Sequence, residues 1–138
     1  MHSHIHLTKY STNQKEKCVF DMKMKLKKYV AIGIAVMGLI HIATTFTPVI
    51  AGKLEQMDVA GLRAFSYMSL MCGALLVLGG MNILLLTDKQ YENTCVKNTL
   101  RLTEALLLVN GIIAACMMLG NPCAWIILIL AIPLPFCP

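Results

Sequence analysis

The strongest constraint on this chain comes from two long stretches without a formal charge, residues 29–50 and 64–86. Each can cross the roughly 30 Å hydrocarbon core of a bilayer as one helix, which takes about 20 apolar residues. Soluble domains carry about a quarter charged residues, whereas 14% of these 138 residues are charged and 57% are hydrophobic. The pattern predicts a small integral membrane protein and argues against a soluble domain, a disordered tail or a nucleic-acid-binding protein.

Two further apolar segments complete the predicted architecture. Residues 100–119 are apolar after their first turn, and residues 124–136 follow an Asn121-Pro122 pair. Asn-Pro after a glycine is a turn signal, so the third and fourth segments are expected to form a tight helical hairpin. The sequence therefore predicts an all-α, integral membrane four-helix bundle over residues 29–138.

The fourth segment contains Pro133 and Pro135, which complicate its path. Proline lacks a backbone donor and takes the usual helical partner from the carbonyl one turn earlier, and an unpaired carbonyl is costly in lipid. Two alternatives stay open. The helix ends near Ala131 with its proline-rich end at the lipid headgroups, or it kinks and crosses fully against neighbours that cover the free carbonyls.

Residues 1–28 carry seven lysines and are expected to form a basic cytoplasmic tail. Residues 1–6 show no helical or strand periodicity, whereas residues 22–28 lead directly into the first apolar segment. Met22 and Met24 are alternative starts, so the residues upstream of them are left out of the fold prediction. We interpret residues 29–50 as an uncleaved span and not as a signal peptide, because the apolar part of such a leader is only about 7–15 residues long.

The basic residues predict the orientation. If the four segments cross alternately, all but two of the 12 Lys and Arg lie on the side of the N-terminal tail, and only Lys53 and Arg63 lie on the other. Basic residues remain on the cytoplasmic side of a membrane. We therefore expect both termini to be cytoplasmic, and the net charge of +5 to attract anionic lipid headgroups.

His41 is the ionisable side chain that lies deepest in a predicted span, and Thr45 follows it one turn later. A polar group inside a span is costly unless it meets a partner or a cavity, which makes it a functional candidate. Asn110 lies near the middle of the third segment and is the expected partner of His41. We predict that His41, Thr45 and Asn110 line a ligand site; the alternative is a neutral imidazole that only hydrogen-bonds across the bundle.

A second polar group is expected near the cytoplasmic ends of the second and third segments. Asn82 and Glu104 each lie about one helical turn inside that end, so their side chains should be level. The hypothesis is that Asn82 hydrogen-bonds Glu104 and that Arg101, three residues earlier, keeps the carboxylate ionised. The alternative is that Glu104 extends to cytoplasmic water.

Small residues recur at helical spacing along one face of the second segment, at Ser69, Gly73 and Gly80. Such residues let helix backbones approach closely in lipid, where no hydrophobic effect drives helices together. We predict that this face packs against a neighbouring helix.

The cysteines and histidines predict neither a metal site nor a dithiol site. The six cysteines include no Cys-x-x-Cys pair, so they are expected to be free, with contact between Cys72 and Cys116 left open. His2, His4 and His6 alternate, but a flexible tail without neighbouring carboxylates does not make a metal site.

Three short motifs carry a family resemblance: Gly38-Leu39-Ile40-His41, Phe65-Ser66-Tyr67 at the start of a glycine-rich helix, and Asn121-Pro122 before Trp125. Over residues 29–136 the chain resembles the DoxX-like superfamily of small four-helix membrane proteins. The resemblance implies a four-helix bundle in a bacterial inner (plasma) membrane, with links to quinone or thiosulfate redox chemistry in some relatives. It transfers no catalytic residue, and His41 is the one position that it highlights.

The leading functional hypothesis is an accessory subunit, or a binder of a small hydrophobic molecule such as a quinone or a lipid held between helices. We expect no activity from the chain alone, and its partners to be the lipid bilayer and either another membrane protein or a second copy.

Two other functions stay open. A transporter would resemble the small multidrug resistance proteins, although the first segment lacks their membrane-embedded glutamate. A membrane enzyme would resemble the glutathione-using microsomal family, although Arg101 and Glu104 are the only charged signature that the chain offers.

Overall fold

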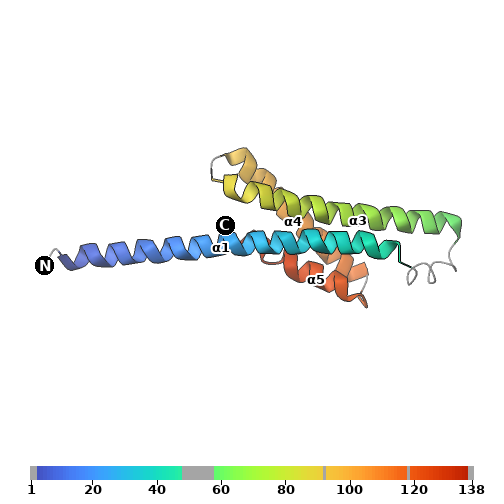
Figure 1. Ribbon diagram of the computed structural model, residues 1–138, viewed down its shortest axis with the longest axis horizontal. Coiled ribbons are helices and arrows are strands. Elements are labelled where there is room, and N and C mark those ends of the chain that lie inside the picture. The colour runs from blue at the N-terminus through green and yellow to red at the C-terminus, as the bar shows by residue number, and fades with distance from the viewer. Residues whose placement is uncertain (1–2, 48–57, 92, 118, 137–138) are drawn as a thin grey trace.

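The computed structural model describes residues 3–47, 58–91, 93–117 and 119–136, with side chains from residue 18 onward. Within these residues the chain is all helical (Figure 1). This confirms the predicted all-α class. Three of the helices are long and apolar enough to cross a membrane. The elements are α1 (Ser3–Thr45), α3 (Val59–Leu86), η1 (Thr87–Lys89), α4 (Thr94–Met117), α5 (Pro122–Ala131) and η2 (Leu134–Phe136), of which η1 and η2 are 3-10 helices.

Helix α1 extends far beyond the predicted first segment. It is continuous over 43 residues, and its N-terminal part runs alone past the ends of the other helices (Figure 1). The expected boundary between a tail and a span at residue 28 is therefore not a break in the helix, since neither Gly nor Pro occurs between residues 3 and 28. The helix ends at Thr45, three residues before Pro48. The predicted residues 48–50 and the connection at 51–57 lie outside the described residues.

Helix α3 begins earlier than the predicted second segment because Asp58 caps it. The Asp58 carboxylate accepts a hydrogen bond from the Gly61 backbone N–H at 2.9 Å, which satisfies one of the free donors at the helix start. Residues 59–63, which lie between the first two predicted segments, are therefore helical. At the other end α3 stops at Leu86, where the prediction placed it, and continues into η1.

Helices α4 and α5 form the predicted hairpin. The Asn121 side chain caps α5 by accepting from the Cys123 N–H at 3.0 Å, with Pro122 in the first turn. The Trp125 indole donates to the Leu119 carbonyl across the turn, at 3.0 Å. Helix α5 ends at Ala131 after 10 residues, so of the two alternatives for the fourth segment the earlier ending is the one observed.

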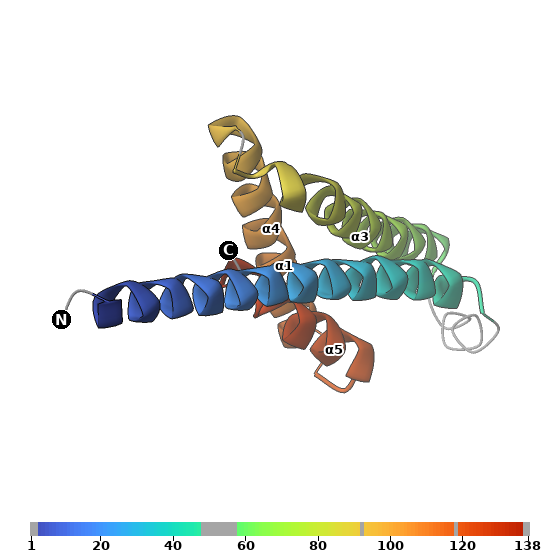
Figure 2. The same cartoon turned by 60° about the vertical axis from the view of Figure 1, so that its left-hand side comes forward.

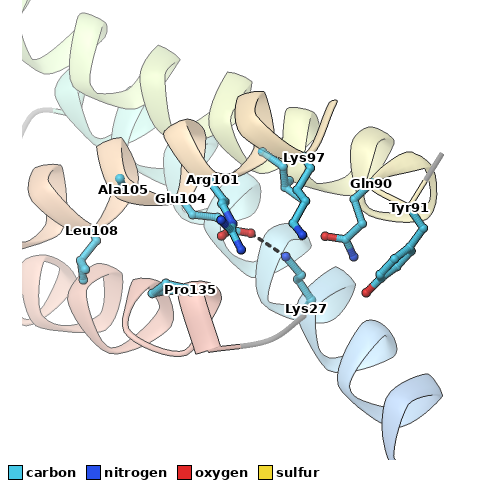
Figure 3. Close-up of a pocket in the computed structure, with 10 residues that line it drawn as sticks. Lys27, Gln90, Tyr91, Lys97, Arg101, Glu104, Ala105, Leu108 and Pro135 are labelled. Atoms are coloured by element: carbon cyan, nitrogen blue, oxygen red, sulfur yellow. Dashed lines mark ion pairs between the residues drawn. The ribbon is translucent and has the colours of Figure 1, made fainter. Parts of the chain in front are cut away.

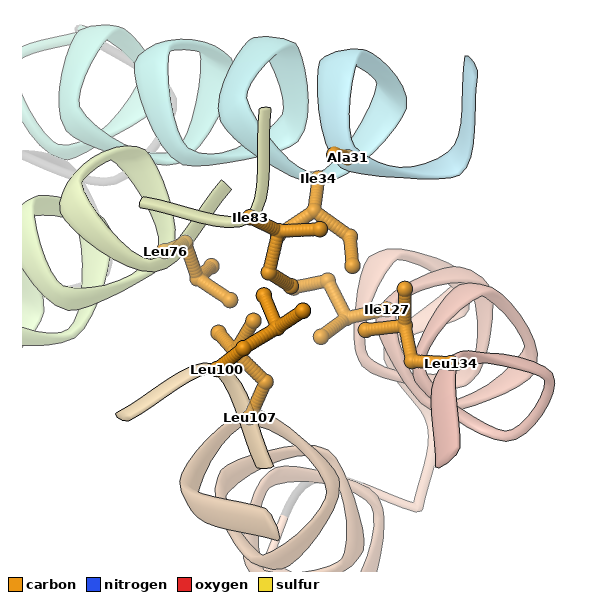
Figure 4. Packing of buried hydrophobic residues seen from close by; sticks show 8 residues of the cluster. All are labelled: Ala31, Ile34, Leu76, Ile83, Leu100, Leu107, Ile127 and Leu134. Carbon is orange, nitrogen blue, oxygen red and sulfur yellow. The ribbon is translucent and has the colours of Figure 1, made fainter. Parts of the chain in front are cut away.

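The four helices are arranged as a ring in which α1 and α4 occupy opposite corners. Helix α1 packs mainly against α3 and also against α5, while α4 packs against α3 and α5. Figure 2 shows the long α1 crossing in front of α4, with α5 on the far side from α3. Eight side chains meet in the centre of the ring (Figure 4): Ala31, Ile34, Leu76, Ile83, Leu100, Leu107, Ile127 and Leu134.

Glycines decide how closely α1 and α3 approach. A Cβ atom placed on Gly38 would lie 2.8 Å from the Gly73 carbonyl oxygen, and one on Gly80 would lie 2.6 Å from the Ala31 carbonyl oxygen. These are backbone atoms, which cannot rotate away as a side chain does. Gly73 and Gly80, both predicted as packing residues, thus lie where α3 is closest to α1, and the partner glycine on α1 is Gly38.

Candidate functional site

A buried ion pair joins the two helices at opposite corners of the ring. Lys27 Nζ on α1 lies 2.6 Å from Glu104 Oε1 on α4, and the two side chains are 2% and 5% exposed. Charges taken out of water are stable only when they are paired with good geometry. Arg101, one turn before Glu104, also acts electrostatically on its carboxylate. Neither helix could bury its charge here without the other.

Beside this ion pair lies a cavity of about 460 Å³ (Figure 3). Its lining comes from the first helix, from the connection between α3 and α4, from α4 and from η2. The polar part of the lining consists of Lys27, Gln90, Tyr91, Lys97, Arg101 and Glu104. The apolar part consists of Leu100, Ala105, Leu108 and Pro135.

The charges of the cavity do not cancel. Lys27, Lys97 and Arg101 are cations and Glu104 is the one carboxylate among the lining residues. Because Lys27 is paired with Glu104, the formal charges of Lys97 and Arg101 remain as an excess. These two residues are four apart on α4 and therefore share one face of the helix. The cavity is suited to an anion.

Gln90 supplies a neutral donor in the same cavity. Its side chain is buried, at 8% exposure, and the Nε2 group has no hydrogen-bond partner among the described residues. A buried amide N–H without an acceptor is uncommon in folded proteins. Figure 3 shows the ends of Gln90, Lys97 and Lys27 turned toward the same space. An acceptor oxygen bound there would satisfy Gln90.

Two contacts next to the cavity hold α1 against the connection between α3 and α4. The Phe20 and Tyr91 rings meet with centroids 5.2 Å apart, and Lys28 forms an exposed ion pair with Asp88 at 2.7 Å. Burial raises the pKa of the Tyr91 phenol, so the Tyr91 side chain carries no negative charge near neutral pH. Phe20 lies in the predicted tail, yet it is part of the packed structure.

The predicted ligand residues His41 and Thr45 lie elsewhere, in a hydrogen-bonded ring with Ser69 of α3. Thr45 Oγ1 donates to the His41 carbonyl at 2.9 Å and lies 2.6 Å from Ser69 Oγ. Ser69 Oγ is also 3.2 Å from His41 Nε2. Since the Thr45 proton is used on the carbonyl, Ser69 donates to Thr45 and accepts from the Nε2–H of His41. Every member of the ring has a partner.

Asn110 does not meet His41. Its side-chain amide contacts the Cys72 sulfur at 3.8 Å, so α3 uses Ser69 toward α1 and Cys72 toward α4. Asn110 and His41 have similar depths in their segments, but depth does not reveal which face of α3 lies between the other two helices. Cys72 and Cys116 are both free, and Cys116 is exposed.

The expected contact between Asn82 and Glu104 is replaced by another. Asn82 is exposed, whereas Glu104 is buried against Lys27. Arg101 does lie close to Glu104, as the hypothesis required (Figure 3). In the sequence, Lys27 and Lys97 stand out only as signals of topology, and Gln90 does not stand out at all. A carboxylate in a predicted span requires a counter-ion, and this requirement was the signal in the sequence that pointed to a cation such as Lys27 as the partner of Glu104.

No group of three or more His, Cys, Asp or Glu able to hold a metal ion occurs among the described side chains. His2, His4 and His6 lie outside them. The carboxylate of Glu104 and the cations around it suit an anionic or hydrogen-bonding organic ligand better than a metal ion, since metals require several anionic or neutral donors.

No family model, curated protein or solved structure matches this chain.

Proposed function

We propose that this protein is integral to the membrane, with α1, α3 and α4 crossing it. The shorter segment of α5 and η2 returns the chain, so that both termini lie on the cytoplasmic side. In α1, the run from Lys27 to Thr45 is about 27 Å long at 1.5 Å per residue, close to the hydrocarbon thickness of a bilayer. Pro135 lines the same cavity as Lys27, which supports a chain whose C-terminal end returns to the side on which α1 enters. We propose a bacterial inner membrane as its location, as the resemblance to DoxX-like proteins implies.

The function we propose is the binding of a small amphiphilic molecule, such as a lipid or a quinone, in the cavity beside Lys27 and Glu104. The observation that carries this proposal is the combination, in about 460 Å³, of excess positive charge, a buried amide without a partner and an apolar wall. On the proposed topology the cavity lies at the membrane–water boundary. A polar headgroup and an apolar tail meet there, and ligand sites commonly pair a few polar groups with an apolar lining.

This proposal moves the predicted binding site along α1. The sequence hypothesis used His41, Thr45 and Asn110, but His41 and Thr45 complete a hydrogen-bonded ring with Ser69, and Asn110 contacts Cys72. A ring whose members are all satisfied gains nothing from a ligand. Glu104 and Arg101, predicted as a separate polar group, line the cavity.

The test is to purify the protein in a mild detergent and to identify the retained lipids and quinones by mass spectrometry. The cavity-filling variant Ala105→Trp is compared with Ala43→Trp, which places the same side chain on an exposed position of α1. We expect wild type and Ala43→Trp to retain a defined amphiphile and Ala105→Trp to lose it.

A second cavity-filling variant, Leu108→Trp, guards against misfolding of the first, and a single symmetric size-exclusion peak shows that each variant is folded. The proposal fails if no defined amphiphile is retained by wild type, or if the folded cavity-filling variants retain it as well as wild type does.

A further inference from the structure

We infer that the cavity recognises a phosphate monoester, held by Lys97, Arg101 and the amide of Gln90. This inference rests on the proposed function and adds the chemical class of the ligand's polar group. A phosphate monoester occurs both as a lipid headgroup and as a free water-soluble anion, and the chemistry of recognition is the same for the two sources.

The charge of the cavity selects among polar groups. With Lys27 paired to Glu104 at 2.6 Å, the cations left over are Lys97 and Arg101. A phosphate monoester carries about −1.5 to −2 charges at neutral pH and would balance both. A carboxylate or a phosphodiester carries a single negative charge and would leave one cation uncompensated. A quinone would compensate neither.

The three donors are of different kinds, which suits a phosphoryl group because it presents several oxygen atoms to be bound. The Arg101 guanidinium can bond two oxygens at once, and the Lys97 ammonium acts as a point charge. The Gln90 Nε2 group lacks an acceptor among the described residues and is buried, so it can take the remaining oxygen. Figure 3 shows the side-chain ends of Gln90 and Lys97 next to each other, with the oxygen of the Gln90 amide on the Lys97 side. The Gln90 donor is the strongest sign that an oxygen atom belongs there, because a buried amide N–H without an acceptor is uncommon in folded proteins.

One end of the cavity is apolar and would accept the part of the ligand next to the phosphate. Ala105 and Leu108 follow Arg101 along α4, and Pro135 faces them from η2. The cavity thus changes from charged to apolar along α4. A lipid with a phosphate monoester headgroup fits both parts, whereas inorganic phosphate would use only the charged part.

The experiment measures binding to the purified full chain in detergent by native mass spectrometry. The lipids are dioleoyl phosphatidic acid, phosphatidylglycerol and phosphatidylcholine with the same acyl chains, and inorganic phosphate is titrated as a competitor. We expect wild type to bind phosphatidic acid at least about tenfold more tightly than the phosphodiester lipids, since each unpaired charged or polar contact is worth about a factor of ten.

The variants separate specific recognition from attraction by bulk charge. Gln90→Leu and Arg101→Gln should each lower affinity for phosphatidic acid about tenfold and bring it near that for phosphatidylglycerol. The control is Lys89→Gln, which removes the same charge as Lys97→Gln from an exposed residue that does not line the cavity. It should leave the preference for phosphatidic acid unchanged.

Each outcome has a defined meaning. Competition by millimolar inorganic phosphate identifies a free phosphate as the source, and its failure to compete identifies the lipid headgroup; both support the inference. Equal binding of the three lipids, or equal effects of Lys89→Gln and Lys97→Gln, overturns it. If an amphiphile is still lost from Ala105→Trp in that case, the proposed function stands without the phosphate. If it is not lost, both fail.

Discussion

Lys27 of α1 and Glu104 of α4 form an ion pair with 2.6 Å between Nζ and Oε1, and both side chains are almost completely buried. The pair connects the two helices that occupy opposite corners of the ring. Removing one partner of a buried pair leaves an uncompensated charge, which costs about 3–5 kcal/mol. We expect Glu104→Gln to lower the free energy of unfolding by that amount, measured by titration with a denaturing detergent.

Two variants control for this loss. Lys27→Met combined with Glu104→Leu leaves no buried charge, and it should be more stable than Glu104→Gln alone. Asp88→Asn breaks the Lys28–Asp88 pair, whose side chains are 34% and 60% exposed, and should cost no more than about 1 kcal/mol. A Glu104→Gln variant as stable as Asp88→Asn would show that Lys27 finds water or another partner when Glu104 is neutral.

The close approach of α1 to α3 predicts different effects for two glycines of the same helix. Gly38→Ala should destabilise the protein by about 1–3 kcal/mol, because its Cβ would lie 2.8 Å from the Gly73 carbonyl oxygen. Gly33→Ala is the matched control. Its Cβ would meet only the Leu130 side chain, at 3.6 Å, and alanine is the better helix former by about 1 kcal/mol. Thermal unfolding in one detergent compares them, and equal melting temperatures would contradict the packing described.

The hydrogen-bonded ring of His41, Thr45 and Ser69 predicts a small, local contribution to stability. Ser69→Ala removes the bonds to both other residues and should lower stability by about 0.5–1.5 kcal/mol. Ser66→Ala is its control, since the Ser66 hydroxyl donates only to the Leu62 carbonyl of its own helix, and it should be close to neutral. Loss of a retained amphiphile from a folded Ser69→Ala variant would return the binding site to His41.

The proposed orientation can be tested with two native cysteines at opposite ends of α4. Cys95 lies in the first turn of α4, and Cys123 lies in the first turn of α5, just after α4. In variants that keep only one of them, a membrane-impermeant maleimide should label Cys95 in inverted vesicles and Cys123 in right-side-out vesicles. Labelling of both from one side would show that α4 does not cross, and the reverse result would place the termini outside.

Much of the helical architecture follows from local sequence. The end of α3 at Leu86 and the α4–α5 hairpin at Asn121-Pro122 agree with the prediction, because the stop signals, charged residues or proline, act on their immediate neighbours. The start of α1 was predicted less well. Hydropathy marks where a helix becomes apolar, and a helix such as Ser3–Thr45 can continue through lysines that favour it.

The sequence by itself predicted an all-helical chain with four apolar segments, and it left Glu104 either in a polar group with Asn82 and Arg101 or extended to water. Only the tertiary structure decided that the partner of Glu104 is Lys27 and not Asn82, and that Gln90 and Lys97 lie beside them. Depth along a helix can be read from residue number at 1.5 Å per residue. The neighbour that a given face meets depends on how the four helices are ordered around the core, which the close contact of Gly38 with Gly73 helps to set.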